Sequence, residues 1–323
     1  MKRNLLSKLI AAMVVCVVFA SCSSIKWVSV DRLVPAEVDL SNRVRRIAVL
    51  NNQPNMEDDE ISGEFFFNSK AVVDTLAQYL ADAAYFDEVV VGDTVLPDDV
   101  THYYRGRKLR PTTVAKLCET FGVDMLVTVD NISFQPYGVN FPFVRGQVWL
   151  SVTCYENMAM EPIATIQKHY TFDRELWHEL KSEVVRLAAL WALPTIVPQW
   201  QMEEFPFYTG ANVGQRDAAV YVREGNWEGA AALWRQQLNH KNRRRRMEAH
   251  LNMAVYHELK DEDVAVARTY AEKALELSKK GKKGKDESTY DGHLISDYVK
   301  DMERRGRNLE RVKQQMRRFS NDF

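Results

Sequence analysis

The chain has 323 residues, of which 46% are apolar and 27% are charged. Its 43 basic and 44 acidic residues give a formal net charge of −1, which excludes both a strongly basic nucleic-acid-binding protein and an acidic halophilic one. A chain of this length and apolar content can form two ordinary domains, each with a hydrophobic core.

The first 22 residues have the pattern of an export signal. Three basic residues precede a short apolar run, Leu9 to Phe19, and the small pair Ala20-Ser21 precedes Cys22. The run is about half the roughly 20 residues that a membrane-spanning helix needs, so it is typical of a cleaved signal. Phe19-Ala20-Ser21-Cys22 resembles the lipobox of bacterial lipoproteins, although Leu is more usual than Phe at its first position. We therefore predict a lipoprotein signal at residues 1–21, cut between Ser21 and Cys22. An ordinary secretory signal with a chance cysteine is the alternative.

The lipobox resemblance also implies where the protein is held. Diacylglycerol on the Cys22 sulfur and a further acyl chain, such as palmitate, on the new amino terminus would attach the chain to a membrane. Ser23 directly after the cysteine favours the outer membrane, and residues 23–26 lack the acidic run typical of surface export. We predict a lipid-anchored outer-membrane protein on the periplasmic face, with residues 22–40 as a tether.

Residues 41–175 carry alternating strand and helix patterns. Runs of β-branched or alternating apolar residues predict strands, and apolar positions at helical spacing predict helices. The predicted strands are residues 45–50, 87–91, 123–134, 147–155 and 162–172, and the predicted helices are residues 64–85 and 111–121. The order β-α-β-α-β-β-β indicates an α/β sandwich with a mixed sheet whose later strands are antiparallel.

Helical patterns dominate the rest of the chain, so we predict the fold class α+β. Residues 176–210 predict a connecting helix and an aromatic linker, and residues 279–323 predict a basic linker and a C-terminal helix. Between them, residues 211–278 contain an internal repeat in which Tyr221 and Tyr256 are 35 residues apart. We expect flanking helices at residues 177–200 and 296–319 to cap this all-α domain.

The repeat resembles the tetratricopeptide family. A Gly225-Asn226-Trp227 turn and small residues where paired helices approach are typical of it, although the second copy lacks the turn glycine. The resemblance implies that one set of side chains packs inside the repeat, namely Tyr221, Trp227, Ala230, Trp234, Tyr256, Ala267 and Tyr270. A plain helical bundle with aromatic core residues is the alternative. In either case, this part of the chain offers contact surfaces and no chemistry of its own.

No catalytic or metal-binding motif occurs in the sequence. Phosphate-binding glycine loops, nucleophile elbows and paired zinc histidines are all missing. We predict a non-enzymatic protein with no cofactor and no metal. The rival interpretation is an envelope enzyme acting on glycan or peptidoglycan, which needs two facing carboxylates that the sequence does not single out. Cys118 and Cys154 remain after the signal and Cys22, and they either form a disulfide or pack as buried thiols.

Two segments are candidate partner contacts. The first is an apolar loop between predicted strands, with Tyr137, Phe141 and Phe143. Exposed aromatic loop residues tend to bind partners, and packing under the sheet is the alternative. The second is a basic run that could meet anionic lipid headgroups or an acidic partner, with a solvated helix face as the alternative. It consists of Arg243, Arg244, Arg245 and Arg246.

Lipobox, α/β domain and degenerate repeat together resemble a family of Bacteroidota lipoproteins without an assigned function. The α/β domain is also similar in element order to the periplasmic modules of curli-secretion and penicillin-binding-protein-activator lipoproteins. We predict a binding or scaffold module for protein partners in the envelope, held to the membrane by its lipid. A subunit of an envelope secretion or assembly machine is the alternative, and no nucleic acid is expected as a partner.

Overall fold

The computed structural model describes residues 25–53, 65–66, 69–92, 108–140, 143–174, 177–210, 212–279 and 290–319. The chain divides into two compact units. The helical unit comprises the chain up to Arg32 and Trp200–Glu310, and the α/β unit comprises Leu33–Gln199 and the chain from Arg311 onward. The predicted signal and Cys22 lie outside the described residues, among which no helix is long and apolar enough to cross a membrane.

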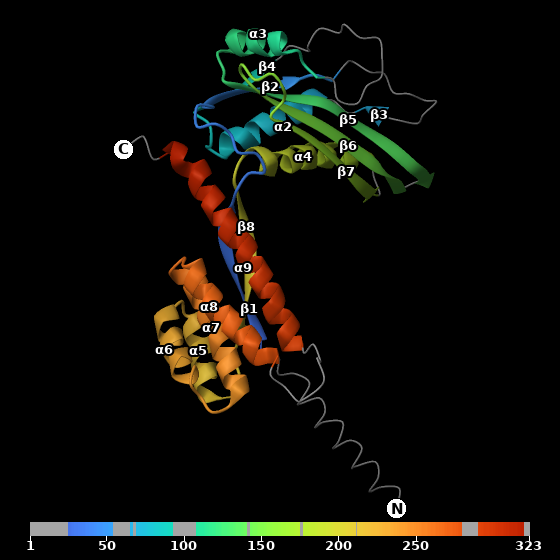
Figure 1. Cartoon of the computed structure of the whole chain (residues 1–323). Helices are drawn as coiled ribbons and strands as arrows, with labels where there is room; N and C mark the ends of the chain where they lie inside the picture. Colours follow the sequence, from blue (N-terminus) through green and yellow to red (C-terminus); the bar gives the residue numbers. More distant parts are fainter. Residues whose placement is uncertain are drawn as a thin grey trace, which may run out of the picture. The chain divides into compact units, whose positions relative to one another are not determined.

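A mixed β-sheet forms the centre of the α/β unit (Figure 1). Its strand order is β4-β2-β5-β6-β7, with the short strand β3 paired to β5. Strand β2 is parallel to β4 and β5, and the β5-β6-β7 ladder is antiparallel. The bounds are β2 Arg46–Asn51, β3 Phe65–Phe66, β4 Glu88–Gly92, β5 Met125–Asn140, β6 Phe143–Glu156 and β7 Ala164–Arg174. The predicted α+β class with a mixed sheet is confirmed.

Helices cover both faces of this sheet: α2 (Ser69–Asp82), α3 (Pro111–Phe121) and α4 (Trp177–Ile196). Helices α2 and α4 pack on one face, over a core that includes Val49 and Val127. Helix α3 packs on the other face, over a smaller core that includes Leu50 and Leu126. Neighbouring residues of one strand reach opposite cores because strand side chains alternate in direction. All four are fully buried, and each contributes about 1.5–3 kcal/mol through burial.

The β5–β6 hairpin is longer than the sequence predicts. Strand β5 continues to Asn140, so the predicted contact loop around Tyr137 is part of the hairpin. Pro136 pairs with Gly146 and Gly138 pairs with Arg145, which leaves Tyr137 as the extra residue of a β-bulge. Proline and glycine end most strand patterns, but a bulge accommodates both, and this is why the predicted strand is too short.

The helical unit combines a two-stranded ribbon with a stack of helices (Figure 1). The bounds are β1 Ile25–Val34, β8 Gln199–Tyr208, α5 Val213–Arg223, α6 Trp227–Gln237, α7 Arg243–Lys260, α8 Val264–Lys279 and α9 Tyr290–Gln315. The 3-10 turn Met316–Phe319 that follows α9 belongs to the α/β unit. Helices α5 and α6 form one pair, and α7 and α8 form the next. Asparagine side chains cap three of them by accepting first-turn N–H groups, namely Asn212, Asn226 and Asn242.

The ribbon corrects two sequence predictions. Strand β1 lies in the segment predicted as a tether, and strand β8 lies in the segment predicted as an aromatic linker. Phe205, Phe207 and Tyr208 of β8 are buried in cores formed with the helices. Neither strand has a partner nearby in the sequence, so local patterns do not report the pairing.

Of the two helices predicted to cover the ends of the repeat, one packs there and the other does not. Helix α9 packs against α7 and α8 through Ile295, Tyr298 and Met302. Helix α4 instead packs in the core of the α/β unit through Val184, Ala188 and neighbouring residues. The prediction that residues 177–200 cap the repeat is therefore wrong, because their apolar side meets the sheet.

Candidate functional site

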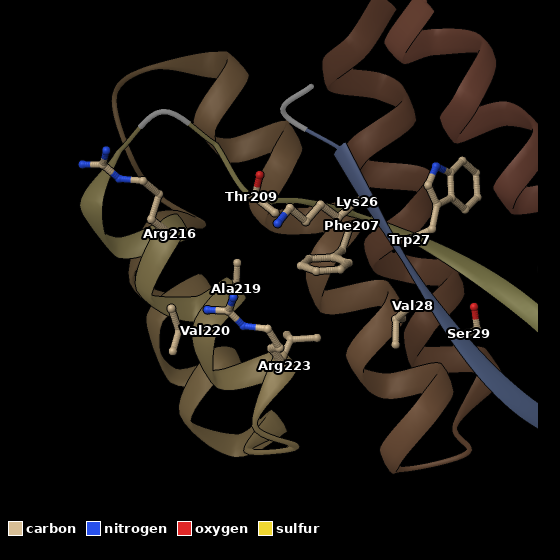
Figure 2. A pocket seen from close by; sticks show the side chains of 11 residues that line it. Lys26, Trp27, Val28, Ser29, Phe207, Thr209, Arg216, Ala219, Val220 and Arg223 are labelled. Carbon is tan, nitrogen blue, oxygen red and sulfur yellow. The ribbon is translucent and has the colours of Figure 1, made fainter. Parts of the chain in front are cut away.

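A groove lies between the ribbon and helix α5 of the helical unit (Figure 2). Its volume is about 530 Å³, within the roughly 300–1,000 Å³ typical of ligand sites. It is lined by Lys26, Trp27, Val28, Ser29, Phe207, Thr209, Arg216, Ala219, Val220, Val222 and Arg223. Figure 2 shows Lys26 and Val28 on the side of β1 that faces α5, whereas Trp27 and Ser29 point to the other side.

Three cations line the groove, and no acidic side chain is among its lining residues. Lys26, Arg216 and Arg223 are exposed, and among the described residues none of their side chains forms an ion pair or a hydrogen bond. Arg216 and Arg223 are two turns apart on α5, so they share one face of the helix. Phe207 and Val222 give the groove a buried apolar floor. The groove therefore suits a partner that is both apolar and acidic.

Helix α7 holds the ribbon through a side-chain amide. The Oδ1 atom of Asn252 accepts the Tyr208 N–H at 2.7 Å, and the Nδ2 atom donates to the Tyr208 carbonyl at 2.7 Å. Asn252 is fully buried, so it can satisfy the backbone groups at the end of β8 as a neighbouring strand would.

A buried ion cluster ties the ribbon to α7 and α9. The Glu258 carboxylate accepts hydrogen bonds from Arg305 at 2.6 and 3.0 Å and from the Tyr298 hydroxyl at 2.7 Å. Arg32 of β1 lies 3.5 Å from the same carboxylate and donates to the Glu258 carbonyl at 2.8 Å. Burial lowers the pKa of Arg305, but the hydrogen bond and charge of Glu258 outweigh burial and raise it. The cluster therefore joins α7 to α9 by a close ion pair and holds β1 through Arg32.

The predicted contact run Arg243–Arg246 forms the first turn of α7, where most of its side chains have local partners. Arg244 pairs with Glu248 at 3.0 Å, and Arg246 donates to the His240 carbonyl at 2.7 Å. A ring nitrogen of His240 lies 3.2 Å from Arg245. The run therefore holds the loop before α7, and its contact with a partner stays a prediction.

The predicted aromatic contacts fall largely outside the described residues. The backbone of Tyr137 lies in β5 and that of Phe143 in β6. Phe141 and the side chains of all three residues are outside the described part of the chain. This contact surface also stays a prediction.

The residues predicted to pack inside the repeat occupy different environments. Ala230, Trp234, Tyr256 and Ala267 are buried, and Trp227 and Tyr270 are partly buried against them. Tyr221 is 37% exposed, so its predicted packing role is wrong. Tyr256 packs in a cluster with α6, whereas in the described part of the chain no helix precedes α5 in the stack to cover Tyr221.

A buried carboxylate lies at the carboxyl end of the parallel strands, where open α/β sheets often bind ligands. Asp130 of β5 accepts hydrogen bonds from Asn52 at 2.7 Å, Thr128 at 2.8 Å and Thr153 at 2.5 Å. Burial raises the pKa of Asp130 to about 6, although these hydrogen bonds lower it. Because both oxygens have protein donors, we assign this cluster to the sheet and not to a ligand.

Neither the two described cysteines nor any cluster of possible metal-binding side chains forms a reactive site in the described part of the chain. Cys118 and Cys154 are free and buried, in cores on opposite faces of the sheet, so the disulfide alternative is wrong. Burial raises the pKa of Cys118 to about 11 and that of Cys154 to about 12, which keeps both thiols protonated at neutral pH. Among the described residues, no group of three His, Cys, Asp or Glu could hold a metal ion.

Two family models match parts of the chain, and both are domains of unknown function. DUF6340 matches residues 216–304, which include α6 to α8, and DUF8603 matches residues 44–148 of the α/β unit. No curated protein matches the chain. Neither family match extends over half of the chain, so neither assigns it a role.

Similar solved structures include two dodecamers of PelC from Paraburkholderia phytofirmans. The first is 10% identical, covers 51% of this chain and 97% of PelC, and has a TM-score of 0.29. The second, a point variant, is 11% identical, covers 50% of this chain and 98% of PelC, and has a TM-score of 0.29. A TM-score this low does not establish a shared fold.

Proposed function

We propose that this chain is a lipid-anchored protein of the outer membrane, on its periplasmic face, that binds protein partners without catalysing a reaction. The groove between β1 and α5 is the observation that carries the proposal. It joins a buried apolar floor to three cations that have no partner among the described residues. Desolvated apolar area together with complementary charge is what specific protein contacts use.

The lipid anchor makes a direct prediction about Cys22. Cells that express the wild-type chain in the presence of labelled palmitate should incorporate the label into it, and Cys22→Ala should abolish incorporation because the acylated sulfur is lost. Cys16→Ala is the matched control, since Cys16 is removed with the predicted signal. Label that persists in Cys22→Ala would contradict the anchor.

The partner role predicts that specific proteins stay bound to the acylated chain. Crosslinking in intact cells, followed by detergent extraction and purification of the chain, should recover the same few envelope proteins in independent preparations. An anchored, unrelated lipoprotein purified in the same way controls for membrane proximity. If no protein is recovered beyond those found with the control, the binding role is wrong, because a scaffold must bind at least one partner.

A further inference from the structure

The internal repeat relates the groove face of α5 to the ribbon-holding face of α7. An offset of 35 residues aligns Ala219-Val220-Tyr221 with Ala254-Val255-Tyr256. Under the same offset, Arg216 of α5 corresponds to Leu251 of α7, and Arg223 corresponds to Glu258. The two helices thus present equivalent faces, one lining the open groove and the other buried in a cluster with α8, α9 and the chain's own ribbon.

On α7, this face holds an extended segment by apolar packing and by charge. Leu251, Ala254 and Val255 share one buried cluster with residues of both strands, including Val28 and Phe205. At the end of the same face, the Glu258 carboxylate pairs at 2.6 Å with Arg305 of α9, and Arg32 of β1 lies 3.5 Å from it. The acidic group on α7 is therefore matched by basic side chains, one on α9 and one on the strand.

On α5, the apolar part of the face is kept and the charge is inverted. Ala219 and Val220 line the groove, whereas Ala254 and Val255 lie in the buried cluster that the ribbon shares with α8 and α9. Arg223 stands where Glu258 stands on α7, and Arg216 replaces an apolar Leu. Lys26 adds a third positive charge from the strand side of the groove. By the same electrostatic logic, the segment that fits here carries carboxylates.

We propose that the groove between β1 and α5 binds an extended, acidic segment of a protein partner, with its apolar side chains on Phe207, Ala219 and Val220 and its carboxylates on Lys26, Arg216 and Arg223. This inference rests on the proposed protein-binding function and names the partner chemistry. Anionic lipid is the competing ligand, because Lys26 follows the predicted anchor Cys22 by only four residues.

The test measures binding of two fluorescent eight-residue probes to the full acylated chain in neutral detergent micelles. One probe alternates valine with glutamate, and the other alternates valine with lysine. Wild type should bind the glutamate probe at least about tenfold more tightly than the lysine probe, and added salt should weaken that binding. Equal affinity for both probes, or no binding of the glutamate probe, would overturn the inference.

Matched variants locate the probe. Replacing Lys26, Arg216 and Arg223 together with glutamine should weaken glutamate-probe binding about tenfold or more. Replacing Lys241, Lys260 and Arg307 with glutamine makes the same charge change at exposed residues of the helical unit outside the groove, and should leave binding within about twofold. An equal loss in both triple variants would show that only net charge matters, against the groove.

A charge reversal tests the relation between α5 and α7. Arg223→Glu recreates the acidic group that Glu258 provides on α7, so it should shift the preference of the groove from the glutamate probe towards the lysine probe. A variant that merely loses affinity for both probes would contradict the inferred correspondence. Circular dichroism of each variant checks that the helices stay folded.

The remaining outcomes separate this inference from the proposed function and from a lipid site. If envelope proteins are recovered equally by wild type and by the groove triple variant, the binding role stands and the groove inference fails. If the glutamate probe binds but no envelope protein is recovered, the proposed function fails, and with it the assignment of the groove to a protein partner, although the preference of the groove for acidic segments is established. Retention on phosphatidylglycerol vesicles that the groove variant loses, without probe binding, would assign the groove to lipid and overturn the inference.

Discussion

Replacing Glu258 with alanine is expected to lower the free energy of unfolding of the helical unit by about 3–5 kcal/mol. The substitution would leave the Arg305 guanidinium, whose side chain is only 4% exposed, without its carboxylate. It would also remove the acceptor of the buried Tyr298 hydroxyl and one of the contacts that hold Arg32. Urea unfolding followed by far-UV circular dichroism measures the loss.

Two further variants separate a buried charge from a general loss of contacts. Glu258→Leu combined with Arg305→Met removes both charges, so it should recover most of the stability that Glu258→Ala loses. Glu272→Ala on α8 breaks an exposed pair with Arg268 and should hardly change the unfolding curve, because solvent screens exposed pairs. If the double variant is as unstable as Glu258→Ala, the loss of stability comes from the lost contacts of these side chains and not from an unpaired buried charge.

The α/β unit could be predicted from sequence because its signals are local. Strand β2 is a short β-branched run, and helix α3 begins at Pro111 and ends before Gly122, which adopts a left-handed φ of 65°. Such patterns report an element wherever the rest of the chain lies. The mixed order of strands then follows from the order of the elements and the rules for parallel connections.

The groove could not be predicted in this way, because it depends on non-local pairing. Strand β1 becomes a wall of the groove only by pairing with β8, which lies far along the chain. One signal was available on α5, where Arg216 and Arg223 stand two turns apart beside the repeat match Ala219-Val220. Its meaning depends on the equivalent face of α7, which is buried with α8, α9 and the ribbon and carries an acidic group that meets basic side chains.

Replacing Asp130 with asparagine is expected to stabilise the α/β unit at pH 7 to 8 by about 3 kcal/mol. The pKa of Asp130 is about 6 in the folded chain, whereas that of an aspartate in water is 3.8. A pKa difference of one corresponds to about 1.4 kcal/mol. Because the folded pKa is raised, the contribution of Asp130 to stability is complete below pH 3.8 and declines as pH rises through about 6.

The neutral amide introduced by Asp130→Asn avoids that decline, so wild type and variant should differ least at acid pH. Urea unfolding of both proteins from pH 4 to 8 measures the difference.

A hydroxyl donor provides the control for this pH effect. Thr153 donates to the Asp130 carboxylate at 2.5 Å, and this bond favours the charged form and lowers the pKa of Asp130. Thr153→Val should therefore cost more stability above pH 6 than below pH 4 in the wild-type background. In the Asp130→Asn background the cost should not depend on pH, because no charge remains for the hydroxyl to stabilise. If the stability cost of Thr153→Val does not depend on pH in either background, the Asp130 carboxyl does not change its charge between pH 4 and 8. That result would contradict the raised pKa on which the prediction rests.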